Sequence, residues 1–222
     1  MGFHMFREVE RLKKEILSLG AQVEEAVQKA ARSIAQRDRS LAQGIIHDDD
    51  KIDSFEVEVE EECLKILALY QPVAIDLRYI ISTLKINNDL ERIGDLAVNI
   101  AQATLFLADY PRVDMPFDFT EMARKAQKMV SDALDSLVNM DAQLAREVCG
   151  GDIEVDNMHA HMYDLVERMG RTEPENVGAL IRLLTVSHHL ERIADHATNI
   201  AEDVIYMTEG RIVRHGEEKK SV

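Results

Sequence analysis

Four pairs of acidic residues with one common spacing are the residues of this sequence best suited to chemistry. In each pair an aspartate follows another acidic residue by four positions, so on a helix both carboxylates lie on the same face. The pairs are Asp49/Asp53, Glu91/Asp95, Asp152/Asp156 and Glu191/Asp195. Like charges at this spacing cost an isolated helix about 0.2–0.5 kcal/mol per pair, and a bound cation would offset that cost. Because carboxylate oxygens select hard ions, the pattern predicts a site for iron, manganese, magnesium or calcium.

The acidic pairs could also serve either of two roles that need no metal. The carboxylates could form internal salt bridges, because arginines directly follow both motif glutamates and others lie nearby in the sequence. The arginines concerned are Arg92, Arg192, Arg78 and Arg182. Alternatively, the acids could only solvate the outer face of a metal-free helical scaffold.

Two histidines lie beside the acidic pairs in the second half of the chain only. His159 follows Asp156 by three positions, and His188 precedes Glu191 by three, so both fall on the predicted acidic faces. They are candidate additional ligands, although a solvated or capping histidine is the ordinary alternative. The position that corresponds to His188 earlier in the chain is Asn88, so the two predicted sites would not be identical.

The chain contains an internal repeat that carries the acidic motifs. Residues 88–101 read NDLERIGDLAVNIA, and residues 188–201 read HHLERIADHATNIA. A repeat of this quality predicts two similar halves. Apolar residues at three- and four-residue steps predict helices throughout, and the order of the elements matches between the halves. We therefore expect an all-α fold of two tandem three-helix bundles, in residues 1–109 and 117–210, joined by a linker at 110–116 and followed by a loose, charged tail at 211–222.

Sequence signals also predict where the helices begin and end. The first helix covers residues 6–36. Gly44 should loosen the chain before the aspartates at 48–50, which would open the second helix, and Gly150–Gly151 should likewise precede a helix that begins at Asp152. Pro72 and Pro174 should break the chain before the motif helices, which should end near Leu107 and at Gly210. In the acidic helices the carboxylates flank or oppose the apolar stripe, so a metal would lie on the bundle surface.

Composition narrows the function. The chain has 41 acidic and 26 basic residues, and a net charge of −15 disfavours direct binding to nucleic acid. The two cysteines, Cys63 and Cys149, have no paired spacing, so a disulfide framework or a thiolate metal site is not indicated. The N-terminus lacks the pattern of a signal peptide, and there is no apolar run of membrane-spanning length. These features predict a cytoplasmic protein.

The sequence lacks the usual signatures of an enzyme. It has no phosphate-binding glycine loop, no dinucleotide fingerprint, no nucleophile elbow and no zincin motif. We predict a protein without a catalytic centre. The alternative is a carboxylate-bridged metalloenzyme, either an oxidase or a hydrolase. Against an oxidase, neither motif glutamate begins the Glu-x-x-His pattern that di-iron bundles use.

Three segments together resemble the PhoU family of bacterial phosphate signalling. They are QPVAIDLR at 71–78, LERIGDLAVNIA at 90–101 and LERIADHATNIAEDVIYMTEG at 190–210. The resemblance implies two three-helix bundles whose eight motif acids hold multinuclear metal clusters, often of iron, on the bundle surface. It further implies a negative regulator of phosphate uptake that restrains phosphate-starvation genes. Its implied partners are the ATPase subunit of a phosphate ABC transporter and a membrane sensor histidine kinase, so contact with the membrane would be peripheral and mediated by partners. A homodimer is also implied.

Overall fold

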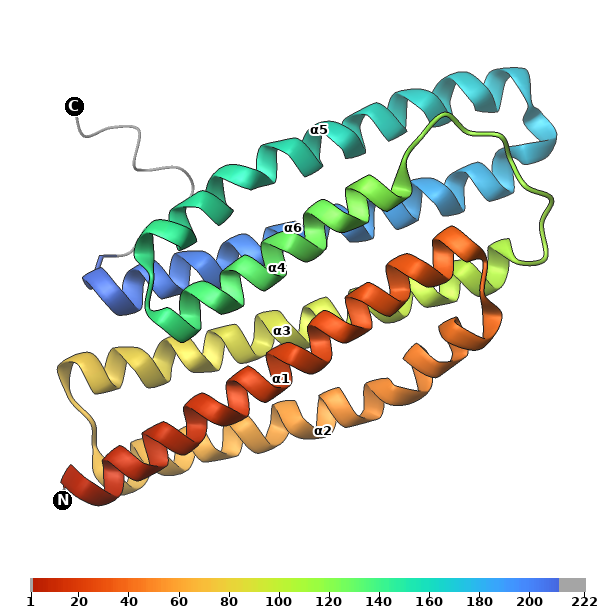
Figure 1. Ribbon diagram of the computed structural model, residues 1–222. Helices are drawn as coiled ribbons and strands as arrows, with labels where there is room; N and C mark the ends of the chain where they lie inside the picture. The colour runs from red at the N-terminus through yellow and green to blue at the C-terminus, as the bar shows by residue number, and fades with distance from the viewer. Residues whose placement is uncertain (1, 212–222) are drawn as a thin grey trace, which may run out of the picture.

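The computed structural model describes residues 2–211, and nearly all of them lie in six long helices (Figure 1). This confirms the predicted all-α fold. The helices are α1 (Gly2–Gln36), α2 (Arg39–Tyr70), α3 (Ala74–Leu107), α4 (Phe119–Asn139), α5 (Ala142–Thr172) and α6 (Val177–Glu209), with a short 3-10 helix, η1 (Pro174–Asn176), before α6. Within the described residues, no helix has a stretch long and apolar enough to cross a bilayer. Apart from Arg211, the predicted tail at 211–222 lies outside the described residues.

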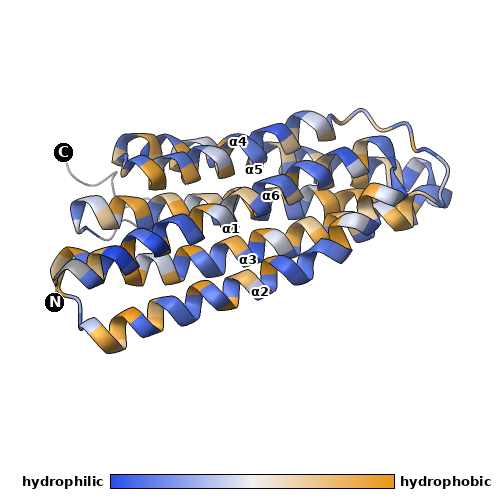
Figure 2. Ribbon diagram, turned by 60° about the horizontal axis from the view of Figure 1, so that its bottom comes forward, coloured by the Kyte–Doolittle hydropathy of each residue, from blue (hydrophilic) through white to orange (hydrophobic). Residues whose placement is uncertain are grey.

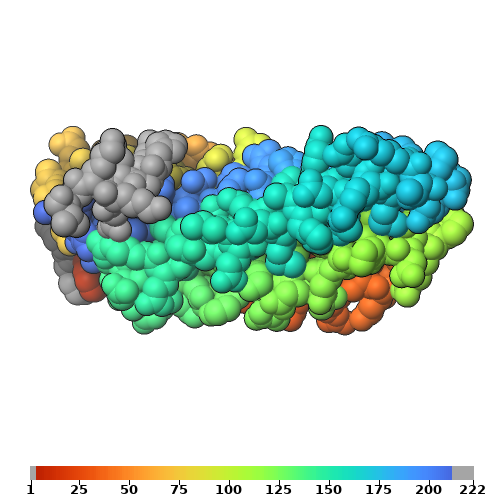
Figure 3. All heavy atoms as spheres, turned by 90° about the horizontal axis from the view of Figure 1, so that it is seen from above, coloured from red at the N-terminus to blue at the C-terminus, as the bar shows by residue number. Residues whose placement is uncertain are grey.

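The helices form two groups of three that share one apolar core. α1, α2 and α3 pack against one another, as do α4, α5 and α6, while α3 also packs on α6 and α1 on α4. α2 and α5 therefore lie on the outer sides of the molecule (Figure 1). Hydrophobic and hydrophilic residues alternate along the helices (Figure 2), and the buried hydrophobic residues form one core cluster. α5 lies along the face of the elongated molecule that Figure 3 shows. At the α1–α4 contact, Gly20 provides a close approach, because a Cβ there would lie 2.6 Å from Leu134 Cδ2.

The predicted starts of the second and fifth helices are wrong. α2 begins at Arg39, where Asp38 accepts a hydrogen bond from the backbone N–H of Leu41, and the helix continues unbroken through Gly44. α5 begins at Ala142 after the capping residue Asp141 and continues through both glycines at 150–151. A glycine inside a helix costs about 1 kcal/mol relative to alanine, but each early segment buries two apolar side chains that offset this cost. Those side chains are Ala42 and Ile45 in α2, and Ala145 and Val148 in α5.

The predicted breaks at the two prolines are confirmed. α2 ends at Tyr70, and Gln71 takes a left-handed conformation (φ 47°) before Pro72 turns the chain into α3. Pro174 begins the 3-10 helix that leads into α6. The predicted ends at Leu107 and at Gly210, which has the positive φ expected of a helix-terminating glycine, are also found. The turns leave α2 beside α3 and α5 beside α6, and this pairing positions the acidic motifs.

The two motif helices differ where each meets its acidic partner helix. A Cβ on Gly94 of α3 would lie 3.3 Å from Ile52 Cγ2 and 3.6 Å from Ile52 Cδ1 of α2. In the second half the repeat places Ala194 at the position of Gly94 and the shorter Val155 at the position of Ile52, and all three side chains are buried. The first half thus pairs glycine with isoleucine, and the second half pairs alanine with valine. The summed side-chain volume at this contact is therefore similar in the two halves.

We predict that Gly94→Ala and Ile52→Val compensate for each other. Ile52→Val alone should cost about 0.5–1.5 kcal/mol of unfolding free energy, because it leaves a small cavity. In the presence of Gly94→Ala it should cost at least about 0.5 kcal/mol less, since the new methyl group takes up part of that space. Urea unfolding of the wild type, both single variants and the double variant measures this coupling.

The control for this cycle is Gly44→Ala, because a Cβ on Gly44 would meet no atom within 4 Å. Its effect should simply add to that of Ile52→Val. If the effects of Gly94→Ala and Ile52→Val were additive, the methyl group added at position 94 would not fill the space left at position 52, and the predicted compensation would be wrong.

Candidate metal centres

The first candidate centre lies along the seam between α2 and α3. Asp49 and Asp53 project from α2, and Glu91 and Asp95 from α3. Burial, together with the neighbouring charges of Asp53, Asp95, Asp50 and Glu91, raises the pKa of Asp49 to about 6. Burial and Asp95 likewise raise the pKa values of Asp53 and Glu91. The four predicted acids of this half are therefore close enough to repel one another.

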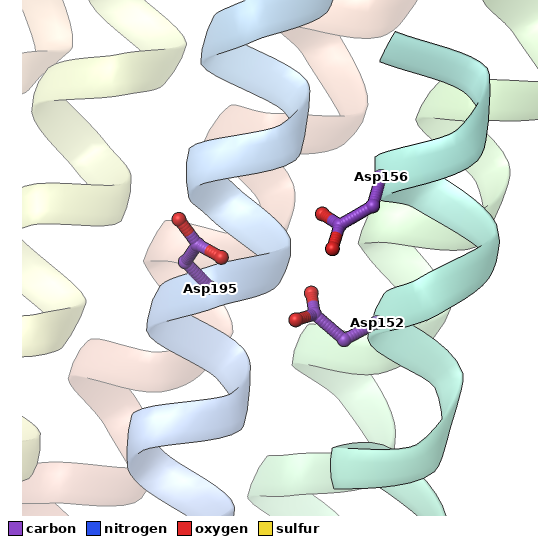
Figure 4. A group of neighbouring side chains, drawn as sticks. All are labelled: Asp152, Asp156 and Asp195. Atoms are coloured by element: carbon purple, nitrogen blue, oxygen red, sulfur yellow. The ribbon is translucent and has the colours of Figure 1, made fainter. Parts of the chain in front are cut away.

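The second candidate centre lies along the seam between α5 and α6. One carboxylate oxygen from each of Asp152, Asp156 and Asp195 lies within 4.8 Å of the other two (Figure 4). Burial raises the pKa of Asp152 to about 6, with further contributions from Asp156, Asp195 and Glu191. Glu191 is the fourth predicted acid; it also raises the pKa of Asp195 but does not join the group of three oxygens. Within residues 2–211, only this half brings three carboxylates so close together.

Both centres contain carboxylate oxygens that accept no hydrogen bond. Glu91 Oε2, Glu191 Oε2 and Asp152 Oδ1 are buried and accept no hydrogen bond within the described part of the chain, although Arg92 Nε lies 3.5 Å from the first and His188 Nδ1 lies 3.1 Å from the second. An ionised carboxylate can only accept, so such oxygens need a donor or a cation. The donor set consists of oxygens on two adjacent helices, which fits a hard or intermediate metal ion.

Salt bridges account poorly for these acids. Arg92 Nε lies 3.5 Å from Glu91 Oε2, and this contact only partly opposes the upward pKa shift of Glu91. Arg182 lies over the ring of Phe106, 4.7 Å from its centroid, and no ion pair between Arg192 and an acid is found in residues 2–211. The pKa values of Glu91 and Asp195 are raised, chiefly by burial and then by neighbouring carboxylates, in spite of Arg92 and Arg192, so these arginines do not compensate the acids.

The acids lie at the solvent-facing edge of each helix pair, as expected for sites outside the core. Asp53 and Asp156 are exposed, whereas Asp49, Asp152 and both motif glutamates are half-buried. Cys63 takes no part in such chemistry, because burial raises the pKa of its thiol to about 12 and keeps it protonated. A thiolate ligand is thereby disfavoured at this position.

The histidines of the second half lie beside its acids. His159 Nδ1 is 2.9 Å from Ser187 Oγ, and the rings of His159 and His188 are 5.5 Å apart. His188 Nδ1 is 3.1 Å from Glu191 Oε2. The structure thus brings both predicted histidines to the edge of the second cluster, where His159 also feels the charge of Asp156.

Sequence reasoning missed a polar contact between the two halves, next to both motifs. Asp89 of α3 lies 2.8 Å from His196 Nδ1 of α6 and accepts a hydrogen bond of 3.2 Å from Asn199. Both side chains, Asp89 and His196, are nearly buried. The signal in the sequence was a mismatch between the repeats, because Asp89 corresponds to His189 and His196 to Leu96. Burial, His188 and Arg192 lower the pKa of His189 to about 4, so this histidine is neutral.

Comparison with known proteins places the whole chain in one family. Residues 16–104 and 119–204 each match the PhoU domain. The PhoU homolog of Aquifex aeolicus, a phosphate-specific transport system accessory protein, is 37% identical over 211 residues, which cover 95% of this chain and 96% of that protein. The Pseudomonas aeruginosa homolog is 38% identical over 212 residues, covering 94% of this chain and 86% of that protein.

Two solved structures share the fold. The crystal structure of PhoU from Pseudomonas aeruginosa superposes with a TM-score of 0.88 at 36% identity, covering 92% of this chain and 99% of that one. The phosphate transport system regulatory protein PhoU from Streptococcus pneumoniae superposes with a TM-score of 0.83 at 28% identity, covering 95% and 100%. The matches span both repeats and favour the regulatory interpretation over a metalloenzyme. The chain belongs to the PhoU family, a family of non-enzymatic regulatory proteins.

Proposed function

We propose that this protein is a cytoplasmic regulatory adaptor that lowers phosphate uptake and restrains the phosphate-starvation response when phosphate is plentiful. The observation that carries the proposal is the match of both halves to the PhoU domain, together with relatives named as accessory proteins of phosphate-specific transport. Its partners would be the ATPase subunit of the phosphate ABC transporter and a membrane sensor histidine kinase, with the protein itself acting as a homodimer.

Exposed apolar residues at the α2–α3 turn support an adaptor role. Leu69, Val73 and Ile75 expose 58%, 72% and 59% of their surfaces. Grouped apolar side chains on a strongly acidic surface are typical of a place where another protein binds. The corresponding α5–α6 turn exposes Val177 and Ile181 at the opposite end of the molecule, so the repeat would present one such surface at each end (Figure 1).

As part of this function, we propose that each acidic cluster holds a multinuclear metal centre, with iron favoured and manganese or magnesium as other suitable ions. Asp49, Asp53, Glu91 and Asp95 would hold the first, and Asp152, Asp156, Glu191 and Asp195 the second. Three observations support this assignment: the raised pKa values, the buried oxygens without donors and the all-carboxylate donor set. Bound metal would supply the positive charge that these carboxylates lack, and would link α2 to α3 and α5 to α6.

Deletion of the gene in its native host tests the regulatory role. In phosphate-rich medium, phosphate uptake and alkaline phosphatase activity should both rise, because the restraint on transport and on the starvation response is lost. A plasmid copy of the wild-type gene should return both to their original values. Unchanged uptake and phosphatase activity in the deletion strain would contradict the proposed function.

Removal of ligands in one half should empty that half alone. Glu91→Ala with Asp95→Ala should lose the metal of the first centre and retain that of the second, and Glu191→Ala with Asp195→Ala should do the reverse. Helical circular dichroism should stay near wild type, since the apolar core is untouched. Metal that binds only the folded state contributes about 2.7 kcal/mol at a hundredfold excess over Kd, so each variant should lose up to this metal-dependent stability.

Elemental analysis and thermal unfolding with and without metal provide the measurements for both variants. Glu58→Ala with Glu61→Ala removes the same charge from exposed positions on α2 and should leave the metal content unchanged. A full metal complement in either motif variant would exclude those acids as ligands, and outright unfolding would favour a structural salt-bridge network.

The pH dependence of the metal-free protein should reveal the repulsion at Asp49. Its folded-state pKa of about 6 lies above the unfolded value, which is about 3.9. The folded state therefore binds more protons between these values and loses stability as the pH rises through that window. Asp49→Asn should match wild type near pH 4 and be more stable by about 1 kcal/mol above pH 6.5, an amount reduced by solvent screening of this half-buried group.

Urea unfolding with a chelator between pH 4 and pH 8 measures this difference, and Asp152→Asn should behave likewise. Asp135→Asn, on an exposed part of α4, serves as the control and should show no such trend. Saturating Mn²⁺ at pH 7 should reverse the sign, because Asp49 then stabilises the bound ion. If the stability of Asp49→Asn and that of wild type changed in parallel with pH, the Asp49 carboxylate would not be destabilised by burial and its neighbouring charges.

A further inference from the structure

Arg37 lies in the connection between α1 and α2, where its side chain is held by the linker between the two halves. Its backbone takes a left-handed conformation (φ 55°), which is uncommon for residues other than glycine. Nη1 donates hydrogen bonds to the carbonyl oxygens of Leu107 at 3.0 Å and Tyr110 at 2.6 Å, and Nη2 donates to that of Pro111 at 3.5 Å. The guanidinium of Arg37 is therefore fixed beside the end of α3, where the linker begins (Figure 1).

The corresponding connection in the second half has no cation. Met140 lies between α4 and α5 with the same left-handed conformation (φ 51°), and Asp141 caps the next helix as Asp38 does after Arg37. The turn accepts an apolar residue in the second half, so its geometry does not require an arginine. The positive charge of Arg37 is thus a feature of the place where the first half meets the linker.

A second arginine lies near Arg37, and no acid neutralises the two charges. Burial, and then the charge of Arg112, lower the pKa of Arg37, and no carboxylate in residues 2–211 offsets these effects. Arg112 is exposed, and its side chain has no hydrogen bond or ion pair within the described part of the chain. Two cations that repel each other in a chain of net charge −15 would be stabilised by a bound anion.

Both arginines keep hydrogen-bond donors for such an anion. A guanidinium has five N–H donors. In Arg37, the contacts with the three carbonyl oxygens leave the N–H of Nε and one N–H of Nη2, and these neighbouring donors can bind two oxygens of one anion. Arg112 keeps all five of its donors.

The two arginines line one cavity between the α1–α2 connection and the start of α4. Its volume is about 250 Å³, slightly below the range of about 300–1,000 Å³ that is common for sites of small molecules. Its walls are mostly apolar and include Val113 and Phe119, while Thr120 adds a hydroxyl group. The cavity therefore suits a small ligand with a negatively charged end.

One acid, Asp118, is among the described residues that line this cavity. It caps α4, and its Oδ1 accepts a hydrogen bond of 3.0 Å from the backbone N–H of Glu121. It forms no ion pair with Arg37 or Arg112 in the described part of the chain, so both guanidinium groups stay available.

We propose that Arg37 and Arg112 bind the phosphate group of a small anion in this cavity. Two guanidinium groups match a doubly charged phosphate better than a carboxylate, because phosphate balances both charges and offers more oxygens. The ligand is either free phosphate or a small organic phosphate whose apolar part contacts the wall of the cavity. The inference goes beyond the proposed regulatory role and does not rest on it, because the arginines and the cavity carry it alone.

Calorimetric titration of the metal-free, full-length protein tests this proposal, because metal at the acidic seams could itself bind phosphate. Inorganic phosphate and AMP represent the two sources of the phosphate group, and acetate and adenosine are the controls for charge and for the apolar part. Phosphate, AMP or both should bind at low ionic strength, and acetate and adenosine should bind much more weakly. Tighter binding of AMP than of phosphate would identify an organic phosphate as the ligand.

Three single variants locate the site. Arg112→Gln should weaken binding of the phosphate group by about 10-fold or more, because charge-assisted hydrogen bonds are lost. Asp118→Asn should strengthen binding, since asparagine also caps a helix and the negative charge at the cavity is removed. Arg7→Gln, which removes an exposed charge at the distant end of α1, should leave binding unchanged.

A measurement on the unaltered protein guards against misfolding of a variant. Addition of phosphate should shift the NMR signals of the Arg112 side-chain Nε–H and the Thr120 amide, while the amide signal of Leu64, near the other end of α2, stays in place. If these signals do not move and Arg112→Gln binds as wild type does, the phosphate binds elsewhere and the proposal is wrong. Failure of both phosphate and AMP to bind would also overturn it, but would leave the regulatory role, which gene deletion tests, unaffected.

Discussion

The packing of α3 against α6 is the constraint on which the rest of the structure depends. Each of these helices contacts the other two helices of its own half as well as the other motif helix, and both are buried along most of their length. Leu90, Ile93, Ala97 and Ile100, and their counterparts one hundred residues later, are fully or almost fully buried. With these faces buried in the core, each motif helix keeps a partly exposed edge beside α2 or α5. The motif acids lie on that edge, so core packing itself brings the carboxylates together.

Where the two halves differ at a contact between helices, both residues of the contacting pair differ. A smaller residue on one helix is matched by a larger one on its neighbour, as at Gly94 and Ile52 against Ala194 and Val155. The hydrogen bond between the side chains of Asn87 and Glu56 has its counterpart in that between Ser187 and His159. Two polar contacts between the halves, the 2.7 Å ion pair of Lys85 with Asp203 and the contact of Asp89 with His196, have no equivalent at the positions that the repeat relates to them, because the residues there are not complementary. The shared core therefore tolerates changes that occur within a contacting pair.

Much of the fold could be predicted from the sequence, because helix periodicity, prolines and the repeat are local signals. The helix ends at Leu107 and Gly210 and the breaks at Pro72 and Pro174 were predicted for that reason. The starts of α2 and α5 were not, since burial of Ile45 and Val148 overrides the local effect of Gly44 and the glycine pair at 150–151. The spacing of the acids predicted which carboxylates face the same way. It could not predict that Glu191 would lie outside the group formed by Asp152, Asp156 and Asp195, nor that His196 would reach Asp89, because these depend on the distance between helices.

The acidic seams also determine where the molecule can respond to its surroundings. Repulsion between carboxylates acts across the contact of an outer helix with a motif helix, while the apolar contacts on the other side of each motif helix are unaffected by charge. A change in the charge at a seam therefore acts first on the pairing of α2 with α3, or of α5 with α6. It can also reach the α3–α6 contact through His196, which bonds to Asp89 and interacts electrostatically with both Glu91 and Asp195. The exposed apolar groups at the α2–α3 and α5–α6 turns join these same helix pairs. A cation at either seam would therefore act on the same helix pair that carries one of these turns, although the acids lie at least about 20 Å from the turn along the helices.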